Sequence, residues 1–327
     1  MYRGVQMNKK WSSGLTRNMR EFGIIIAFII ILVALMIISP SAFASPRNLV
    51  GIVRQAAING ILACGMMFVI ISNGIDLSVG STVALAGVMA AHFAHPDSYP
   101  LVVPVVLAVV IGTAVGMING LGVAYGNIPP FIITLATMTA VRGTALIASG
   151  GSPVYGLSDS FKNISSGTIG NTIIPVLAVY FICVLCLSGF ILTKTVFGRH
   201  VYAVGSNVNV AHLSGINIAR VTLTGYILCS VTAALGGVLV ASKLQNGQPA
   251  ACEGYEMYAI ASTVLGGTSL TGGSGSVGRA MFGVAIIAVI NNGMNLLHIS
   301  SYWQKVVIGS IILLAVILDM AQKKKNA

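Results

Sequence analysis

The chain has 327 residues, of which 56% are hydrophobic and 8% are charged, with a mean hydropathy of +0.91. This composition excludes a soluble globular domain and is typical of a protein that crosses a membrane many times. The net charge of +11 would suit a nucleic-acid-binding protein, but the basic residues follow the loops between apolar runs, so we exclude nucleic acid as a partner.

Ten apolar runs follow one another along the sequence, and each is close to the roughly 20 residues that a membrane-spanning helix needs. The eighth is short and rich in glycine. We therefore predict an all-α polytopic membrane protein with about ten transmembrane helices, forming a single domain over residues 1–327. The runs lie near residues 22–39, 54–72, 77–95, 101–125, 131–149, 173–193, 221–242, 256–270, 279–297 and 302–319.

The Lys and Arg residues predict the orientation of these helices. If both termini lie in the cytoplasm, twelve of these residues fall in cytoplasmic segments and five fall outside. Cytoplasmic loops carry the excess of basic residues, so the bias predicts a cytoplasmic N-terminus and C-terminus. The cytoplasmic segments then include an N-terminal tail (1–21), a long loop (194–220) and a C-terminal tail (320–327).

The break between the second and third runs, residues 72–80, is too short to form a true loop. Gly74 is placed to end one helix and Asp76 to cap the next, in a tight hairpin. An acidic residue beside the membrane is also a candidate functional group. Both interpretations of Asp76 stay open at this point.

Five polar residues lie inside the apolar runs, where a polar side chain is costly unless it is paired or faces water. We predict that the asparagines line a polar path and that Arg142 lies near its outer half. The alternative for Arg142 is pairing with carbonyls at a helix end. The residues are Asn119, Arg142, Asn291, Asn292 and Asn295.

The loop 194–220 carries a signal for one short helix, with Asn207 as the N-cap and Gly215 at the C-terminal end. Two turns are too short to be stable alone in water. The helix either docks in a groove of another protein or is a capped connector on the membrane surface. The docking helix would run from Asn207 to Gly215, and the residues expected at the contact are Arg199, Asn207, Ala211, Leu213, Ser214 and Gly215.

The segment from Lys243 to Tyr258 is predicted to lie at an outer mouth. Glu253, Tyr255 and Glu256 supply acceptors and an aromatic face that would suit a polyhydroxyl ligand or a soluble partner. An ordinary solvated loop would have the same composition. No metal site is expected, because the cluster of His92, His95 and Asp97 sits in a short Pro-containing turn that offers its ligands little support.

Two features of the sequence indicate internal order. Ser81-Thr-Val83 recurs as Ser262-Thr-Val264, on helices of opposite predicted direction, which would fit an inverted repeat around a central path. The glycines of 273–278 spell G-x-G-x-x-G, but they lack the preceding strand and the following acidic residue of a dinucleotide site. We interpret this stretch as a flexible hairpin and expect no cofactor.

Four stretches together resemble the permeases of ribose-type sugar ABC importers: GIDLSVGS (74–81), FGRHVYAVGSN…LSGIN (197–217), GYEMYAIASTVLGGTSLTGGSGS (254–276) and NNGMNLL (291–297). The resemblance covers nearly the whole chain. It departs at Asn73, where relatives often have Gly.

The resemblance implies a type II ABC importer-like permease in a bacterial inner membrane. Its expected partners are a second permease copy, a cytoplasmic ATP-binding ABC subunit and a periplasmic sugar-binding protein. It further implies that the loop 194–220 contains the helix that couples the pore to the ATPase. The substrate would be a monosaccharide related to ribose, allose or xylose, and the sequence does not decide which.

Two other classes compete with this interpretation. An ion-coupled secondary sugar transporter needs an intramembrane carboxylate or His as carrier, whereas all seven acidic residues lie at span ends or in loops. A membrane enzyme would need a catalytic set, and no Ser/His/Asp set or metalloprotease motif occurs. The chain also has no Walker A motif, so ATP hydrolysis is expected in a separate subunit.

Overall fold

The computed structural model describes residues 25–26, 28–96, 99–170 and 172–326. The predicted N-terminal tail (1–21) and Asp97 lie outside the described residues, as do the side chains of 321–327 in the predicted C-terminal tail. All regular elements of the described part are helices, apart from two isolated bridges between loop residues.

The prediction of an all-α polytopic membrane protein is confirmed. Six of the described helices, α3, α5, α6, α8, α11 and α13, are long and apolar enough to cross a membrane. The number of crossings and the orientation remain predictions. The helices are Phe28–Ile38, α2 (Pro40–Phe43), α3 (Pro46–Ile71), α4 (Val79–His92), α5 (Val102–Ala124), α6 (Pro130–Ser149), α7 (Asp159–Ser166), α8 (Val176–Lys194), α9 (Val196–Ser206), α10 (Val208–Leu213), α11 (Ile218–Leu244), α12 (Tyr255–Leu265), α13 (Val277–Leu296) and α14 (Ser301–Asn326).

The third and eighth predicted spans differ from expectation, because neither is a full-length helix. At 1.5 Å per residue, the 14 residues of α4 cover about 21 Å and the 11 residues of α12 about 16 Å. Both are shorter than the roughly 30 Å hydrocarbon core. The third predicted span is non-helical at its start, residues 77–78, and the eighth is non-helical at its end, residues 266–270.

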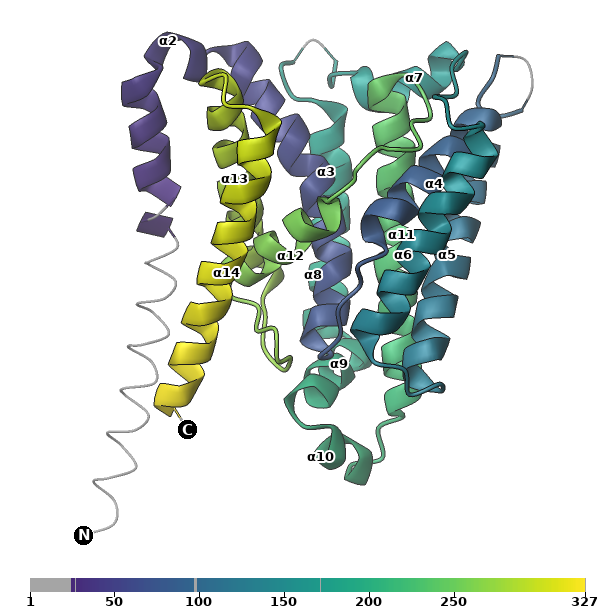
Figure 1. The fold of residues 1–327 in the computed structure, drawn as a ribbon, viewed down its shortest axis with the longest axis vertical. Coiled ribbons are helices and arrows are strands. Elements are labelled where there is room, and N and C mark those ends of the chain that lie inside the picture. Colours follow the sequence, from purple (N-terminus) through teal and green to yellow (C-terminus); the bar gives the residue numbers. More distant parts are fainter. Residues whose placement is uncertain (1–24, 27, 97–98, 171, 327) are drawn as a thin grey trace.

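The long helices α3 and α11 each lead into one of these short helices (Figure 1). α3 descends to the end of the bundle that carries α9, and the chain then climbs through an extended segment to α4. α11 rises to the opposite end, and the chain descends through a second extended segment to α12. The two units therefore run in opposite directions, the arrangement that the predicted inverted repeat requires.

Close helix packing at the centre depends on glycine. A Cβ atom added at Gly112 of α5 would lie 2.6 Å from the Ser230 carbonyl oxygen, and one at Gly116 would lie 2.6 Å from the Ile227 Cα atom of α11. The G-x-x-x-G pair thus brings α5 against the backbone of α11, as the sequence indicates. Most of α3 from Ala57 onward is buried in the middle of the bundle.

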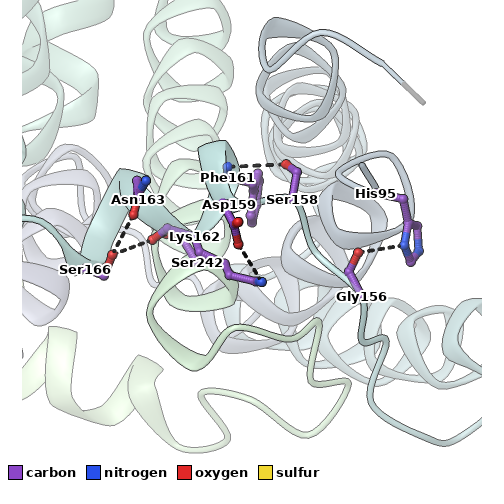
Figure 2. A network of polar contacts seen from close by, with 9 residues as sticks. All are labelled: His95, Gly156, Ser158, Asp159, Phe161, Lys162, Asn163, Ser166 and Ser242. Atoms are coloured by element: carbon purple, nitrogen blue, oxygen red, sulfur yellow. Dashed lines mark hydrogen bonds and ion pairs between the residues drawn. The ribbon is translucent and has the colours of Figure 1, made fainter. Parts of the chain in front are cut away.

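α7 lies at the end of the bundle opposite α9 and α10 (Figure 1). In the segment around it, His95 Nδ1 lies 2.9 Å from the Gly156 carbonyl oxygen, and Lys162 pairs with Asp159 at 2.9 Å (Figure 2). The Ser242 hydroxyl of α11 donates to the Lys162 carbonyl at 2.9 Å. These contacts fix the segment 150–172, predicted as a loop, onto the ends of α4 and α11.

Candidate functional site

The extended segment between α3 and α4, residues 72–78, is the first helix break. It centres on Asp76, whose side chain is completely buried. Asp76 Oδ1 accepts hydrogen bonds from the Ser78 backbone N–H at 2.9 Å and from the Ser78 hydroxyl at 2.6 Å. Asn119 of α5 donates to the Ser78 hydroxyl at 2.8 Å. Tyr226 of α11 donates from its hydroxyl to the Ile75 carbonyl at 3.2 Å. Side chains of two helices, α5 and α11, therefore hold the first break in place.

The local geometry of the first break corrects two details of the predicted hairpin. Asn73, not Gly74, is the residue in the left-handed region, with φ +67°, and the Gly74 N–H then donates to the Val69 carbonyl at 2.8 Å. Ser78, not Asp76, occupies the N-cap position of α4. Asp76 binds the N–H two residues further along the chain, as a short polar side chain does in a turn.

Residues 245–254, between α11 and α12, form the second helix break. Arg142 Nη1 of α6 donates to the Pro249 carbonyl at 2.7 Å and to the Ala251 carbonyl at 2.9 Å. Of the two interpretations of Arg142, carbonyl pairing is therefore observed, although the carbonyls belong to turns between two helices rather than to a helix end. A backbone pair between Gly247 and Val154 holds the other end of the break.

The two short helices meet at their N-termini. A Cβ atom added at Gly80, in the first turn of α4, would lie 2.5 Å from both the Cys252 carbonyl oxygen and Glu256 Oε2. The absence of a side chain at Gly80 thus lets the start of α12 approach the start of α4. Glu256, in the first turn of α12, is buried at this contact, and α12 lies near mid-height of the bundle (Figure 1).

A cavity of about 920 Å³ lies beside this contact, between α6, the second break with α12, and α14. Its volume is within the range of small-molecule sites, about 300–1,000 Å³. We call it the α6–α12–α14 cavity. Four charged side chains line it, two basic and two acidic, together with a tyrosine: Arg142, Lys305, Glu253, Glu256 and Tyr258. Tyr255, predicted with the two glutamates, instead forms a T-shaped aromatic pair with Tyr258, with the two ring centroids 5.4 Å apart.

The five polar residues predicted to line one path take part in separate interactions. Asn119 belongs to the first break, and Arg142 lines the α6–α12–α14 cavity. Asn292 forms a reciprocal amide pair with Asn48 of α3, at 2.7 and 3.1 Å. Asn295 accepts from Gln304 at 2.7 Å, and Asn291 is buried in α13. Their role in transport stays a prediction.

The predicted short helix in the loop 194–220 is present as α10. Asn207 caps it, with Oδ1 accepting from the Val210 N–H at 3.1 Å, and Gly215 follows it with φ +77°. Leu213 is 85% exposed, whereas Ala211 is only 2% exposed. The expected contact at Ala211 is therefore not available, because its methyl group packs into the protein's own core.

α9, a second helix in the same loop that the sequence did not predict, joins α10 to the end of α3 and to the connection after α12. A Cβ atom added at Gly205 would collide with the Ile71 carbonyl oxygen and the Gly273 backbone nitrogen. Tyr202 donates to the Gly275 carbonyl at 3.0 Å, and the Gly273 N–H donates to the Ile71 carbonyl at 2.9 Å. Gly273 and Gly275 are thus part of a packing surface for α9.

Residues 48–316 match the model of a protein family described as the permease component of the branched-chain amino acid transport system. Because the match covers most of the chain, the protein belongs to this family of membrane transport permeases. It is accordingly a multi-pass protein of the inner membrane, in agreement with its six long apolar helices.

Several curated relatives are named for sugars. The chain is 43% identical to the ribose import permease protein of Bacillus subtilis, with 94% of each chain covered. It is 36% identical to the D-allose transport system permease protein of Escherichia coli, over 91% of each chain. It is 35% identical to the xylose transport system permease protein of the same species, over 94% of each chain. No solved structure gives a significant match.

The structure adds residues to the candidate site that sequence analysis did not select. Tyr258 and Lys305 line the α6–α12–α14 cavity, and Asn48 pairs with Asn292 across α3 and α13. Lys305 had a usable signal, because it is a basic residue near the start of an apolar run. Asn48 had none, because it lies in a polar stretch before its run.

Proposed function

We propose that the chain is the membrane-spanning permease subunit of a binding-protein-dependent ABC importer, and that it carries a monosaccharide into the cell. The observation that carries this proposal is its 35–43% identity, over nearly the whole chain, to permeases named for ribose, allose and xylose. The family description names branched-chain amino acids, so the relatives, which cover almost all of the chain, supply the substrate class.

The ATP-binding subunit is proposed to dock on α10. Val208, Val210 and Leu213 expose apolar surface there, and α10 has only six residues, too few for a helix to persist without packing. Ala211 anchors α10 to its own chain, while Leu213 supplies surface for a partner. Arg199 is exposed on the adjacent helix α9.

The topology supports the same assignment. α10 and the end of α14 lie at one end of the bundle, and α7 lies at the other (Figure 1). With the predicted orientation, α10 faces the cytoplasm and α7 faces the periplasm, where the sugar-binding protein would deliver its ligand. A second permease copy would complete the transporter, and residues 1–327 would form a single permease domain.

Leu213→Ser tests the ATPase contact. A hydrophobic side chain at the centre of a contact contributes about 2 kcal/mol or more, so its loss should weaken binding of the ATP-binding subunit at least tenfold. The measurement is co-purification of the subunit with the permease, together with ATPase activity stimulated by sugar-loaded binding protein. Val196→Ser on α9, which is also exposed, is the matched control.

Uptake in intact cells tests the energy source. Import should continue when proton and sodium gradients are collapsed by ionophores while ATP is maintained, and it should stop when ATP is depleted. Uptake that stops with the ionophores would instead indicate the ion-coupled secondary sugar transporter.

For the separate test of the ATPase contact, full co-purification of the ATPase with Leu213→Ser would remove α10 from the contact.

A further inference from the structure

The α6–α12–α14 cavity has the composition of a site for a neutral polar molecule. Its two basic and two acidic side chains cancel in formal charge: Arg142 and Lys305 against Glu253 and Glu256. An isolated cation or anion would meet as many like charges as opposite ones. A polyhydroxyl ligand would instead find acceptors in the carboxylates and donors in the guanidinium and ammonium groups.

The remaining walls of the cavity are apolar. Met138, Leu146, Ile308 and Ile312 line it, and Tyr258 adds a half-buried aromatic side chain. A sugar presents hydroxyl groups at its edge and C–H groups on its faces, so it matches walls that combine a few polar groups with apolar and aromatic surface. Fully apolar walls would favour a lipid chain, but a lipid chain forms no hydrogen bonds with the four charged groups of this cavity.

The position of the cavity is also suited to a substrate. It adjoins the point where the N-termini of α4 and α12 meet, and substrate sites in transporters built from inverted repeats lie near mid-membrane beside interrupted helices. Arg142 uses Nη1 for the Pro249 and Ala251 carbonyls. No other hydrogen bond of its guanidinium is found within the described part of the chain, which leaves donors for a ligand.

We propose that the α6–α12–α14 cavity is a monosaccharide-binding site within the permease itself, in which Glu256 and Arg142 bind the hydroxyl groups. The inference rests on the proposed function, since it assumes that a sugar is the substrate. It adds that the permease contributes to substrate recognition, rather than leaving all selectivity to a soluble binding protein.

Two glycines allow the cavity to be filled without disturbing the rest of the fold. A Cβ atom added at Gly143 or Gly309, which both line the cavity, would meet no other atom within 4 Å. The same is true of Gly51 in α3 and Gly278 in α13, which do not line it. Gly143→Leu and Gly309→Leu therefore fill the cavity, and Gly51→Leu and Gly278→Leu are helical controls of equal size.

The transport measurement uses the complete importer reconstituted with its ATP-binding subunit and loaded binding protein, with D-ribose, D-allose and D-xylose as probes. We expect the two filling variants to lower uptake at least tenfold and the two controls to lower it less than twofold, with all four assembling normally. Unchanged uptake in the filling variants would overturn the site while leaving the importer assignment intact. Loss of the second permease copy in Gly143→Leu would also overturn it, because the cavity would then be a subunit contact.

Direct occupancy is measured on the purified permease alone, so that failure of delivery or coupling cannot mimic failure of the site. Thr139 lines the cavity, and Thr139→Cys places a thiol there. Saturating D-ribose, D-allose or D-xylose should slow labelling of this thiol by a methanethiosulfonate reagent at least threefold. Leu213→Cys, at an exposed position on α10 outside the cavity, is the control whose labelling should not change. Protection by none of the three sugars, or protection by L-leucine instead, would overturn the monosaccharide site.

Discussion

The two helix breaks have the same order of elements but different surroundings. Each follows a long helix, and each is associated with a Gly-x-acid sequence: Gly74-Ile-Asp76 lies within the first break, and Gly254-Tyr-Glu256 runs from the end of the second break into the first turn of α12. Asp76 is completely enclosed and bound by its own segment and by α5. Glu256 lies at the wall of the α6–α12–α14 cavity. Similar sequences thus give a closed polar cluster in one half and a cavity wall in the other.

The difference indicates a division of labour between the halves. The first break is held by side chains of α5 and α11, two helices that pack closely together, so it is part of the framework. The second break is held mainly by Arg142, a single side chain from α6. A segment that depends on one side chain is easier to displace, which is appropriate for the part of a transporter that must move past its substrate.

The largest expected effect is the loss of the first break's acceptor. Asp76→Leu leaves the Ser78 N–H and hydroxyl buried without a partner, at a cost of about 1–3 kcal/mol for each group. We expect the folded permease to be recovered in much lower yield and to unfold at a lower temperature in detergent. Asp76→Asn is the control, because its amide oxygen can take the place of Oδ1, which accepts both hydrogen bonds. Equal stability of the Leu variant and the unsubstituted protein would contradict a framework role.

Arg142→Ala should affect function more than folding. It leaves the Pro249 and Ala251 carbonyls without their donor, at a cost of about 2–4 kcal/mol confined to the second break. We expect sugar uptake to fall at least tenfold while the permease still inserts and still co-purifies with its ATPase. Arg142→Lys keeps a positively charged donor, an ammonium group, but loses the planar guanidinium fork. It should therefore restore part of the uptake. If Arg142→Ala fails to insert into the membrane, then both breaks are parts of the framework that folding requires.

Gly205→Val tests the contact of α9 with the end of α3 and with the connection after α12. The added side chain would press on the Ile71 carbonyl at the end of α3 and on Gly273 in the connection after α12. Overpacking of this kind costs about 1–3 kcal/mol. We expect ATP hydrolysis and sugar uptake to become uncoupled, measured as the number of ATP molecules hydrolysed per sugar imported. Gly215→Val strains the backbone that ends α10, where φ is +77°, but leaves α9 in contact with both segments, so it shows the effect of damage to α10 alone.

The sequence predicted the parts of the fold that repeat a simple pattern. Apolar runs located the helices, and Asn207 with Gly215 located α10, because both signals depend on neighbouring residues alone. The half-length of α4 and α12 was not predicted. A non-helical segment that packs against another helix can be as apolar as a helix, so an apolar run does not show where the helix begins or ends. The partner of Arg142 was likewise hidden, because Pro249 and Ala251 are distant in sequence and contribute only their carbonyls.

The candidate site was predicted only in part, for a related reason. Glu253, Glu256 and Arg142 were selected as polar residues in or beside apolar runs, and the structure places them around one cavity. Asn119, Asn291 and Asn295 satisfied the same criterion but lie in other environments. A polar side chain within an apolar run shows only that the residue needs a partner. It does not show whether that partner is a side chain, water or a substrate.

The smallest expected effect concerns the ends of α3 and α11, where both breaks begin with a residue in the left-handed region. Asn73 has φ +67° and Gln245 has φ +57°. Asparagine tolerates this conformation better than glutamine, and glycine adopts it without a steric penalty. Gln245→Gly should therefore stabilise the protein by up to about 1 kcal/mol, which corresponds to a rise in melting temperature of roughly 1–3 °C. Asn73→Gly should change it by less than half as much. Both substitutions should leave uptake unchanged, since both side chains are exposed. A larger gain at Asn73 than at Gln245 would mean that the framework break carries the greater backbone strain, which is the reverse of the division of labour inferred from their side-chain contacts.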